Sequence, residues 1–289
     1  MTSSAASLIC AVWMHDMSDR PTVLITGGTR GLGLACARYM AKAGWNVAIS
    51  DLSEQACRVY GEAESVQHIL DELQSNGVLA RFVAANLTDE AQAWDLARQV
   101  SSDFGTIDGL VTFAGGDIRG DDPAAAGGKA PNNSAFAEHR DFLSIYERNF
   151  FTCVYACRAV AHAMRARCQG RIVTVASVSA GFGVNRETSY AVAKAGVVHF
   201  TRCLAAELRP DGINVNCIAP GGTNTGRFRA TLKDRTPADL ERLQGQGRLE
   251  RLAQPEDICK VVHFFLSPAS DFVSGQVLRV DGGQFTGPI

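Results

Sequence analysis

Short apolar runs alternate with longer amphipathic stretches along most of this 289-residue sequence. The clearest runs read TVLIT, NVAIS and RIVTVA, and they lack the polar alternation of a strand that has one face in water. Nearly continuous apolar runs are typical of parallel strands that are buried on both faces. The alternation therefore predicts an α/β fold made of right-handed βαβ units around a parallel sheet.

The same pattern divides the chain into expected elements. The strands are expected at residues 23–26, 46–50, 80–84, 109–113, 171–176, 214–218 and 276–280. The helices are expected at residues 31–43, 54–76, 89–104, 139–168, 188–209 and 255–267. Residues 1–20 do not share the pattern and are expected to be a disordered tail, which leaves 21–289 as a single domain.

Two glycine- and proline-containing stretches, residues 115–138 and 221–254, interrupt the pattern. Loops of this length in a compact domain are often binding loops, so both are expected to border the substrate. A tolerated surface insertion is the alternative interpretation of the first stretch. Basic residues occur in or beside these loops, namely Arg119, Lys129, Arg186, Arg227 and Arg229. They suggest an acidic or phosphorylated substrate, such as a carboxylate or an acyl thioester carrier, although ordinary solvated charges are the favoured interpretation.

Composition excludes several other classes of protein. The 28 Lys and Arg residues against 30 Asp and Glu residues give a formal net charge of −2, without the basic excess of a nucleic-acid-binding protein or a polybasic membrane tether. No apolar run reaches the roughly 20 residues of a membrane helix. The nine scattered cysteines favour reduced thiols in a cytoplasmic protein. No metal-ligand spacing is present, and Cys153 and Cys157 are interpreted as small helix residues packed against a partner subunit.

Residues 26–33 (TGGTRGLG) follow the first expected strand and begin the first expected helix. Glycine is needed where the backbone turns tightly and a pyrophosphate approaches main-chain N–H groups. The helix then offers unpaired donors and a positive dipole end to the phosphates. Placed between a strand and a helix, this glycine-rich turn predicts a dinucleotide site.

Asp51 and Arg30 bear on which dinucleotide is bound. Asp51 ends the second strand, where a carboxylate accepts hydrogen bonds from the ribose hydroxyls and repels a 2′-phosphate. Arg30 favours the opposite outcome, because a guanidinium can hold a 2′-phosphate. We expect Arg30 to pair with Asp51 instead, and the sequence therefore favours NAD over NADP.

Tyr190 and Lys194 are spaced i, i+4 and so lie on one helix face. A tyrosine has a pKa near 10 and is a poor base at neutral pH, but a neighbouring ammonium favours the phenolate. Ser177 ends the fifth strand, at the sheet edge where ligands of parallel α/β folds bind. Together with the glycine-rich turn, the three residues predict acid–base chemistry beside a bound dinucleotide.

From residue 22 to 285 the sequence resembles the short-chain dehydrogenase/reductase family. The resemblance rests on TGGTRGLG, Asp51, the Asn149 of ERNFF, the Ser177 of VASVSAG, YAVAK, NVNCIAPGGTNT and SGQVLRVDGG. It implies a single-domain, Rossmann-type, doubly wound parallel sheet of seven strands in the order 3-2-1-4-5-6-7. It also implies a homotetramer or homodimer that interconverts a secondary alcohol and a ketone.

The resemblance also implies the role of each site residue. Tyr190 would be the general acid/base, Ser177 would position the substrate oxygen, and Lys194 would hold the nicotinamide ribose and lower the tyrosine pKa. Asn149 would hold a water that links Lys194 to solvent. The cofactor contacts would be Gly27, Thr29, Arg30, Gly31, Leu32, Gly33, Asp51, Leu52, Asn86, Leu87, Ala114, Gly115, Tyr190, Lys194, Pro220, Gly221, Thr223 and Thr225.

The sequence departs from the family at two places. Residues 112–115 read TFAG where the family usually has Asn-Asn-Ala-Gly, so side-chain bonds that steady the central sheet are expected to be missing. Asn86 replaces the usual Asp at the adenine, which its amide oxygen is still expected to reach. Two alternative functions remain open: an NADPH-dependent 3-oxoacyl thioester reductase and a non-catalytic NAD-sensing protein.

Overall fold

The computed structural model describes residues 20–116, 134–185, 187–230 and 247–287, together with Pro237 and Glu241. The expected tail therefore lies outside the described residues except for Arg20, as do most of the first expected loop and a large part of the second. Arg119, Lys129 and Arg186, three of the basic residues named above, also lie outside them.

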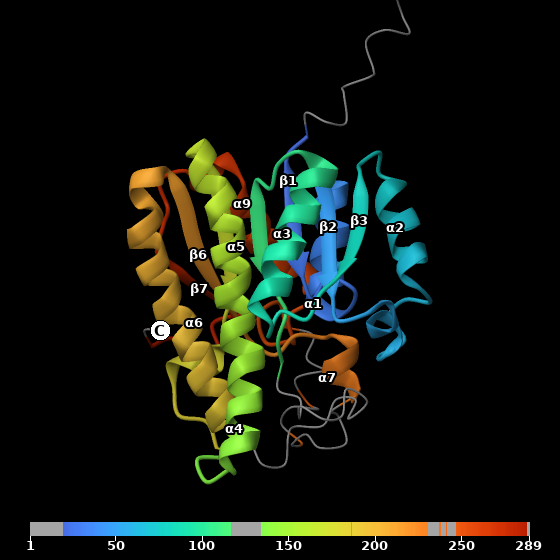
Figure 1. The fold of residues 1–289 in the computed structure, drawn as a ribbon. Helices are drawn as coiled ribbons and strands as arrows, with labels where there is room; N and C mark the ends of the chain where they lie inside the picture. The colour runs from blue at the N-terminus through green and yellow to red at the C-terminus, as the bar shows by residue number, and fades with distance from the viewer. Residues whose placement is uncertain are drawn as a thin grey trace, which may run out of the picture.

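A single parallel sheet forms the centre of the described chain (Figure 1). Its strands are β1 (Thr22–Thr26), β2 (Asn46–Asp51), β3 (Ala80–Ala84), β4 (Gly109–Thr112), β5 (Gly170–Val175), β6 (Ile213–Pro220) and β7 (Val277–Val280). Their order, β3-β2-β1-β4-β5-β6-β7, and the parallel pairing of all neighbours confirm the predicted topology. Every residue of β1 and β2 is buried, as expected for strands covered on both faces.

Helices cover both faces of this sheet (Figure 1). One layer consists of α1 (Gly31–Lys42), α2 (Val66–Gln74) and α9 (Pro255–Leu266). The other contains α3 (Glu90–Phe104), α4 (His139–Tyr146), α5 (Thr152–Arg167) and α6 (Thr188–Leu208). The short α7 (Gly226–Ala230) follows β6, beyond the carboxyl ends of the strands. No helix among the described residues is long and apolar enough to cross a membrane.

Two of the predicted helices differ in the structure. The stretch 54–76 is not one helix: it consists of a 3₁₀ turn, η2 (Glu54–Arg58), and the separate α2. Gly61, with a φ of 65°, lies between them, and Ser65 caps α2 by accepting a hydrogen bond from the His68 N–H at 3.1 Å. The stretch 139–168 is interrupted by a π-helical turn, η3 (Glu147–Phe151), between α4 and α5.

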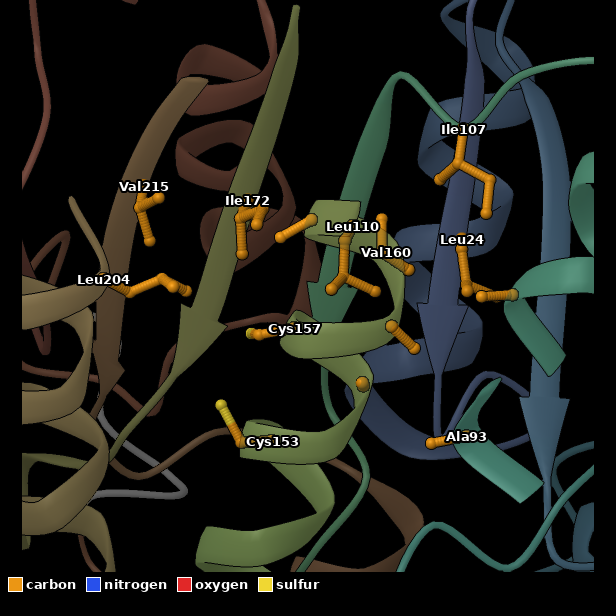
Figure 2. Close-up of a cluster of buried hydrophobic side chains, with 14 of the residues drawn as sticks. Leu24, Ala93, Ile107, Leu110, Cys153, Cys157, Val160, Ile172, Leu204 and Val215 are labelled. Carbon is orange, nitrogen blue, oxygen red and sulfur yellow. The ribbon is translucent and has the colours of Figure 1, made fainter. Parts of the chain in front are cut away.

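The prediction that Cys153 and Cys157 face a partner subunit is wrong. Both side chains are buried in the core of this chain, beside Leu110 of β4 and Ile172 of β5 (Figure 2). The face of α5 that carries them packs on the sheet, because small side chains allow a helix to approach the strands closely. The Thr112 hydroxyl donates a hydrogen bond to the Cys153 sulfur at 3.4 Å, so β4 and α5 are joined there by a polar contact.

Candidate active site

A cavity of about 790 Å³ lies at the carboxyl ends of the central strands. Its walls contain all but two of the residues predicted to bind the cofactor or substrate. The two exceptions, Thr29 and Asn149, lie directly behind the wall and form hydrogen bonds with its residues. The structure therefore brings together side chains from positions 27 to 225 of the chain, as ligand sites of open parallel sheets require.

The glycine-rich turn connects β1 to the first turn of α1. A Cβ atom at Gly33 would lie 2.0 Å from the carbonyl oxygen of Gly27, so the first turn of α1 packs against this loop without space for any side chain. A Cβ atom at Gly27 would lie 2.9 Å from the backbone nitrogen of Ala114, on the neighbouring β4 side. Gly27 and Gly31 have φ values of 64° and 55°, which glycine adopts without strain.

Asp51 is buried at the end of β2 and forms hydrogen bonds with both carboxylate oxygens. The Thr29 hydroxyl donates to Oδ2 at 2.6 Å, and the backbone N–H of Leu52 donates to Oδ1 at 2.9 Å. The predicted pair between Arg30 and Asp51 is not formed, although both residues are described. The turn directs Arg30 toward the η2–α2 connection, and its guanidinium carbon lies 5.4 Å from the centre of the Tyr60 ring.

Sequence reasoning missed two residues at this end of the cavity, Tyr60 and Glu62. One carboxylate oxygen of Glu62 accepts a hydrogen bond from the Gly31 N–H at 2.6 Å, and the other accepts one from the Gly226 N–H at 2.8 Å. Glu62 therefore connects the start of α1 to the start of α7. The signal that reveals this loop is Gly61 in the middle of an apparent helix, followed by a serine N-cap.

Ser177, Tyr190 and Lys194 line the opposite end of the cavity. Ser177 lies two residues after the end of β5, and its hydroxyl accepts a hydrogen bond from the Ser179 hydroxyl at 2.9 Å. Tyr190 lies in the first turn of α6 and is half-buried. The Nζ atom of Lys194, one helical turn later, lies 5.8 Å from the centre of the Tyr190 ring.

Lys194 is buried, and its ammonium donates a hydrogen bond to the Val175 carbonyl at 2.9 Å. The pKa of Lys194 is lowered from 10.5 to about 8, mainly by burial, and the charge of Arg227 contributes in the same direction. The nearby thiols of Cys153 and Cys217 oppose this decrease. The lysine is therefore mainly protonated at pH 7, but much less strongly so than a lysine in water.

Asn149 is completely buried in the π-helical turn. Its Oδ1 accepts from the Gly116 N–H at 2.7 Å, and its Nδ2 donates to the carbonyls of Gly116 and Ile145 at 3.0 and 2.8 Å. Both ends of the side-chain amide are thus engaged with the backbone. The visible effect of Asn149 is to hold the segment after β4 against the start of α5.

At both places where the sequence departs from the family pattern, residues 112–115 and Asn86, the structure has hydrogen bonds within the chain. Thr112 contacts Cys153, and the Ala114 N–H donates to the Thr26 hydroxyl at 3.1 Å, so polar contacts still join β4 to its neighbours. The expectation that side-chain bonds are missing there is therefore only partly right. The Asn86 amide oxygen accepts from both the N–H and the hydroxyl of Thr88, at 3.2 and 2.8 Å.

The fold and this arrangement of groups define the class of nucleotide-dependent oxidoreductases. Over residues 27–284 the chain matches the family described as enoyl-(acyl carrier protein) reductase. The cyclohexanol dehydrogenase of Rhodococcus sp. (strain TK6) is 33% identical over 267 residues, which are 90% of this chain and 94% of that enzyme. The 3-oxoacyl-(acyl-carrier-protein) reductase of Vibrio cholerae is 30% identical over 262 residues, 91% and 96% of the two chains.

A solved structure agrees with these sequence matches. A 7α-hydroxysteroid dehydrogenase in complex with NADH and 7-oxoglycochenodeoxycholic acid superposes with a TM-score of 0.77 and 32% identity, covering 91% of this chain and 93% of that one. The chain therefore belongs to the short-chain dehydrogenase/reductase family.

Proposed function

We propose that this protein interconverts a secondary alcohol and a ketone with NAD as the cofactor, and that Tyr190 is the general acid/base. The observation that carries the proposal is one cavity lined both by the glycine-rich turn with Asp51 and by Ser177, Tyr190 and Lys194. Two relatives support the reaction class, since one is named for cyclohexanol and the other was solved with NADH and a 7-oxo steroid acid.

The residues present fit a dinucleotide. A Cβ at Gly27 or at Gly33 would collide with backbone, so the turn keeps this close-packed form only with glycine at both positions. Asp51 offers its carboxylate to the ribose hydroxyls, and we infer that Gly31 and Leu32 face the phosphates at the start of α1. When bound, the nicotinamide ring supplies or accepts the hydride.

Side chains of the protein then bind the substrate oxygen and transfer the proton. Ser177 hydrogen-bonds the substrate oxygen and holds it near Tyr190. The Tyr190 hydroxyl gives a proton to that oxygen during ketone reduction and, as the phenolate, takes one during alcohol oxidation. The Lys194 ammonium favours the phenolate of Tyr190, and Asn149 keeps the backbone after β4 in place.

The choice between NAD and NADP depends on Asp51 and Arg30. Asp51 supports NAD because its charge would repel a 2′-phosphate. Arg30 supports NADP, because it does not neutralise Asp51 and its Nη1 has no hydrogen-bond partner. We place more weight on Asp51, which the Thr29 hydroxyl and the Leu52 N–H hold at the end of β2. An NADPH-dependent 3-oxoacyl thioester reductase is the second candidate, supported by Arg30 and by the Vibrio cholerae relative.

A steady-state panel of secondary alcohols and ketones with NAD(H) and NADP(H) tests this proposal. We expect turnover of cyclic secondary alcohols and a kcat/KM at least tenfold higher with NAD than with NADP. Replacing Asp51 with Asn should reduce this preference, because the repulsive charge is removed. A strong preference for NADPH and 3-oxoacyl thioesters would favour the second candidate. Binding of NAD without any turnover would favour a non-catalytic NAD-sensing protein.

We also propose, from the family, that the protein is a homotetramer or homodimer and, from its scattered cysteines, that it is cytoplasmic.

A further inference from the structure

Arg227 has an unusual place in the cavity wall. It is the second residue of α7, and the preceding residue, Gly226, is fixed beside the start of α1 by Glu62. From there its side chain extends to Gly116, where a Cβ atom would lie 2.0 Å from Nη1 and 3.0 Å from Cζ. The guanidinium therefore occupies space that exists only because residue 116 is glycine.

The guanidinium lies at the catalytic end of the cavity. Gly116 is the residue that Asn149 holds through both its N–H and its carbonyl. Arg227 is also close enough to Lys194 for its charge to lower the pKa of that ammonium. Two cations, Arg227 and Lys194, thus line the same cavity as Tyr190 and Ser177.

Arg227 forms no hydrogen bond or ion pair within the described chain. Other arginines there have partners: Arg229, on the same helix, donates to the Asn224 side chain at 2.8 Å, and Arg251 pairs with Asp257 at 2.7 Å. Glu147 and Glu187 also line this cavity. A half-buried guanidinium beside a buried ammonium is unfavourable unless an anion joins them.

A guanidinium in this position is suited to a carboxylate. Its planar fork donates two parallel hydrogen bonds to the two carboxylate oxygens, and this pairing strengthens where water is excluded. We propose that Arg227 is a specificity-determining residue that binds the carboxylate of a hydroxy acid or oxo acid substrate whose reacting carbon lies at Tyr190. This inference rests on the proposed alcohol–ketone function and names the substrate class for it.

The diphosphate of the cofactor is the other anion that Arg227 can meet, since the backbone of α7 starts close to α1. The two sources make different predictions. A diphosphate contact would affect the binding of every dinucleotide and the turnover of every substrate equally. A substrate carboxylate contact would affect only substrates that carry the acid group.

Matched substrates separate these outcomes. We would measure kcat/KM for 4-hydroxycyclohexanecarboxylate, its uncharged carboxamide and cyclohexanol, using wild type, Arg227→Met, Arg227→Lys and, as a control on the same helix, Arg229→Met. We expect Arg227→Met to lower kcat/KM for the acid about 10- to 100-fold, as expected for a lost charged hydrogen bond, and to change the two neutral substrates less than threefold. Arg227→Lys should recover part of the loss, and Arg229→Met should behave as wild type.

Several results would overturn the inference. It fails if the acid and the carboxamide lose activity equally, or if Arg227→Met weakens NADH binding measured by fluorescence titration, because Arg227 then serves the diphosphate or the fold. It also fails if wild type turns over neutral alcohols but not the acid, an outcome that leaves the proposed function intact. If wild type oxidises no alcohol at all, the proposed function fails. Titration of the acid into the NADH complex of wild type and Arg227→Met then still tests the anion site.

Discussion

At the scale of single residues, Lys194 is a buried cation, and the burial of its charge makes the folded protein less stable. Its hydrogen bond to the Val175 carbonyl does not offset the loss of hydration, and its pKa is therefore lowered to about 8. Groups with perturbed pKa values in a cavity are typical of functional sites. The proposed role of Lys194, to favour the phenolate of Tyr190, explains why a charge is kept at a position that burial penalises.

Replacing Lys194 with Met should therefore stabilise the protein at pH 7 while removing its activity. The unfolded chain binds a proton at this site up to pH 10.5, but the folded chain only up to about 8. The full penalty on wild type thus applies below pH 8 and disappears as the pH rises to 10.5. At pH 7 we expect a gain of about 1–3 kcal/mol in the free energy of unfolding, since each pKa unit corresponds to about 1.4 kcal/mol.

Urea unfolding at pH 7 and at pH 10 measures this gain, with the exposed Lys42→Met variant as a control. The difference between Lys194→Met and wild type should shrink at the higher pH. A variant that is no more stable than wild type at pH 7 would contradict the burial argument.

Gly33 and Gly31 allow a second test at this scale. Alanine at Gly33 would place a Cβ 2.0 Å from the backbone oxygen of Gly27, so the turn must shift. Alanine at Gly31 meets no atom within 4 Å and suffers only from its φ of 55°. We expect Gly33→Ala to abolish NADH binding and Gly31→Ala to cost about 1 kcal/mol of stability. Equal NADH affinity of Gly33→Ala and wild type in a fluorescence titration would disprove the proposed role of the turn.

Individual residues were predictable where a local pattern fixes their place. Asp51 and Ser177 end strands, and Tyr190 and Lys194 share a helix face, so the sequence brings them to one edge of the sheet. The pairing of Arg30 with Asp51 was predicted wrongly, because it depends on the loop that contains Tyr60. Contacts of that kind join residues distant in sequence and leave no periodic signal.

At the scale of elements, the connection from η2 to α2 links the two halves of the cavity. The carboxylate of Glu62 accepts from the first turns of both α1 and α7. A Cβ at Gly226 would lie 2.8 Å from the Glu62 carboxylate and 2.9 Å from the Cβ of Tyr60, so α7 packs tightly on this connection. The negative charge of Glu62 thus lies at the N-terminal start of α1, where the diphosphate is expected.

The Glu62→Gln variant should bind the cofactor more tightly than wild type and should be less stable. The amide keeps one acceptor but places a donor against the second backbone N–H, which costs about 1 kcal/mol. Loss of the charge removes repulsion of the diphosphate, and we expect the Kd for NADH to decrease two- to tenfold, more so at low salt. Calorimetric titration and thermal melting measure both effects, with the exposed Glu64→Gln as the control. Weaker NADH binding by Glu62→Gln would show that Glu62 supports the cofactor instead.

Element boundaries were less predictable than element types. The strands and the four other helices follow from apolar periodicity, and the structure reproduces them within a few residues. The helix predicted at 54–76 was wrong because its apolar spacing hides a break at Gly61, where the positive φ ends helical geometry. The π turn at Glu147–Phe151 leaves no signal in composition or apolar spacing, and the sequence therefore predicts one continuous helix over 139–168.

At the scale of the whole molecule, the strand order follows from two general rules of connection. Crossovers between parallel strands are right-handed, and strands consecutive in sequence tend to be neighbours, so few sheet topologies remain once seven strands are recognised. The described surface nevertheless carries large apolar side chains near the sheet edge formed by β7. Phe272 is fully exposed, and Leu278 of β7 is 43% exposed. Contiguous exposed apolar patches are typical of interaction surfaces, and these two side chains lie within and just before the edge strand β7.

We therefore expect this edge to be buried in the proposed homo-oligomer. Analytical ultracentrifugation of wild type should give a species of about four, or about two, times the 30.9 kDa of one chain. Phe272→Asp should give a smaller species, because a buried interface does not tolerate an unpaired charge. A monomeric wild type would contradict the proposed assembly.

The central claim is that the Tyr190 hydroxyl transfers the proton at the substrate oxygen. Its most direct test is single-turnover oxidation of an alcohol that the wild type accepts, with NAD bound to wild type and to Tyr190→Phe. We expect the variant to bind NAD with unchanged affinity and hydride transfer to slow by about 10²- to 10⁴-fold, the usual loss of a general acid/base. A Tyr190→Phe variant that reduces NAD as fast as wild type would contradict the account.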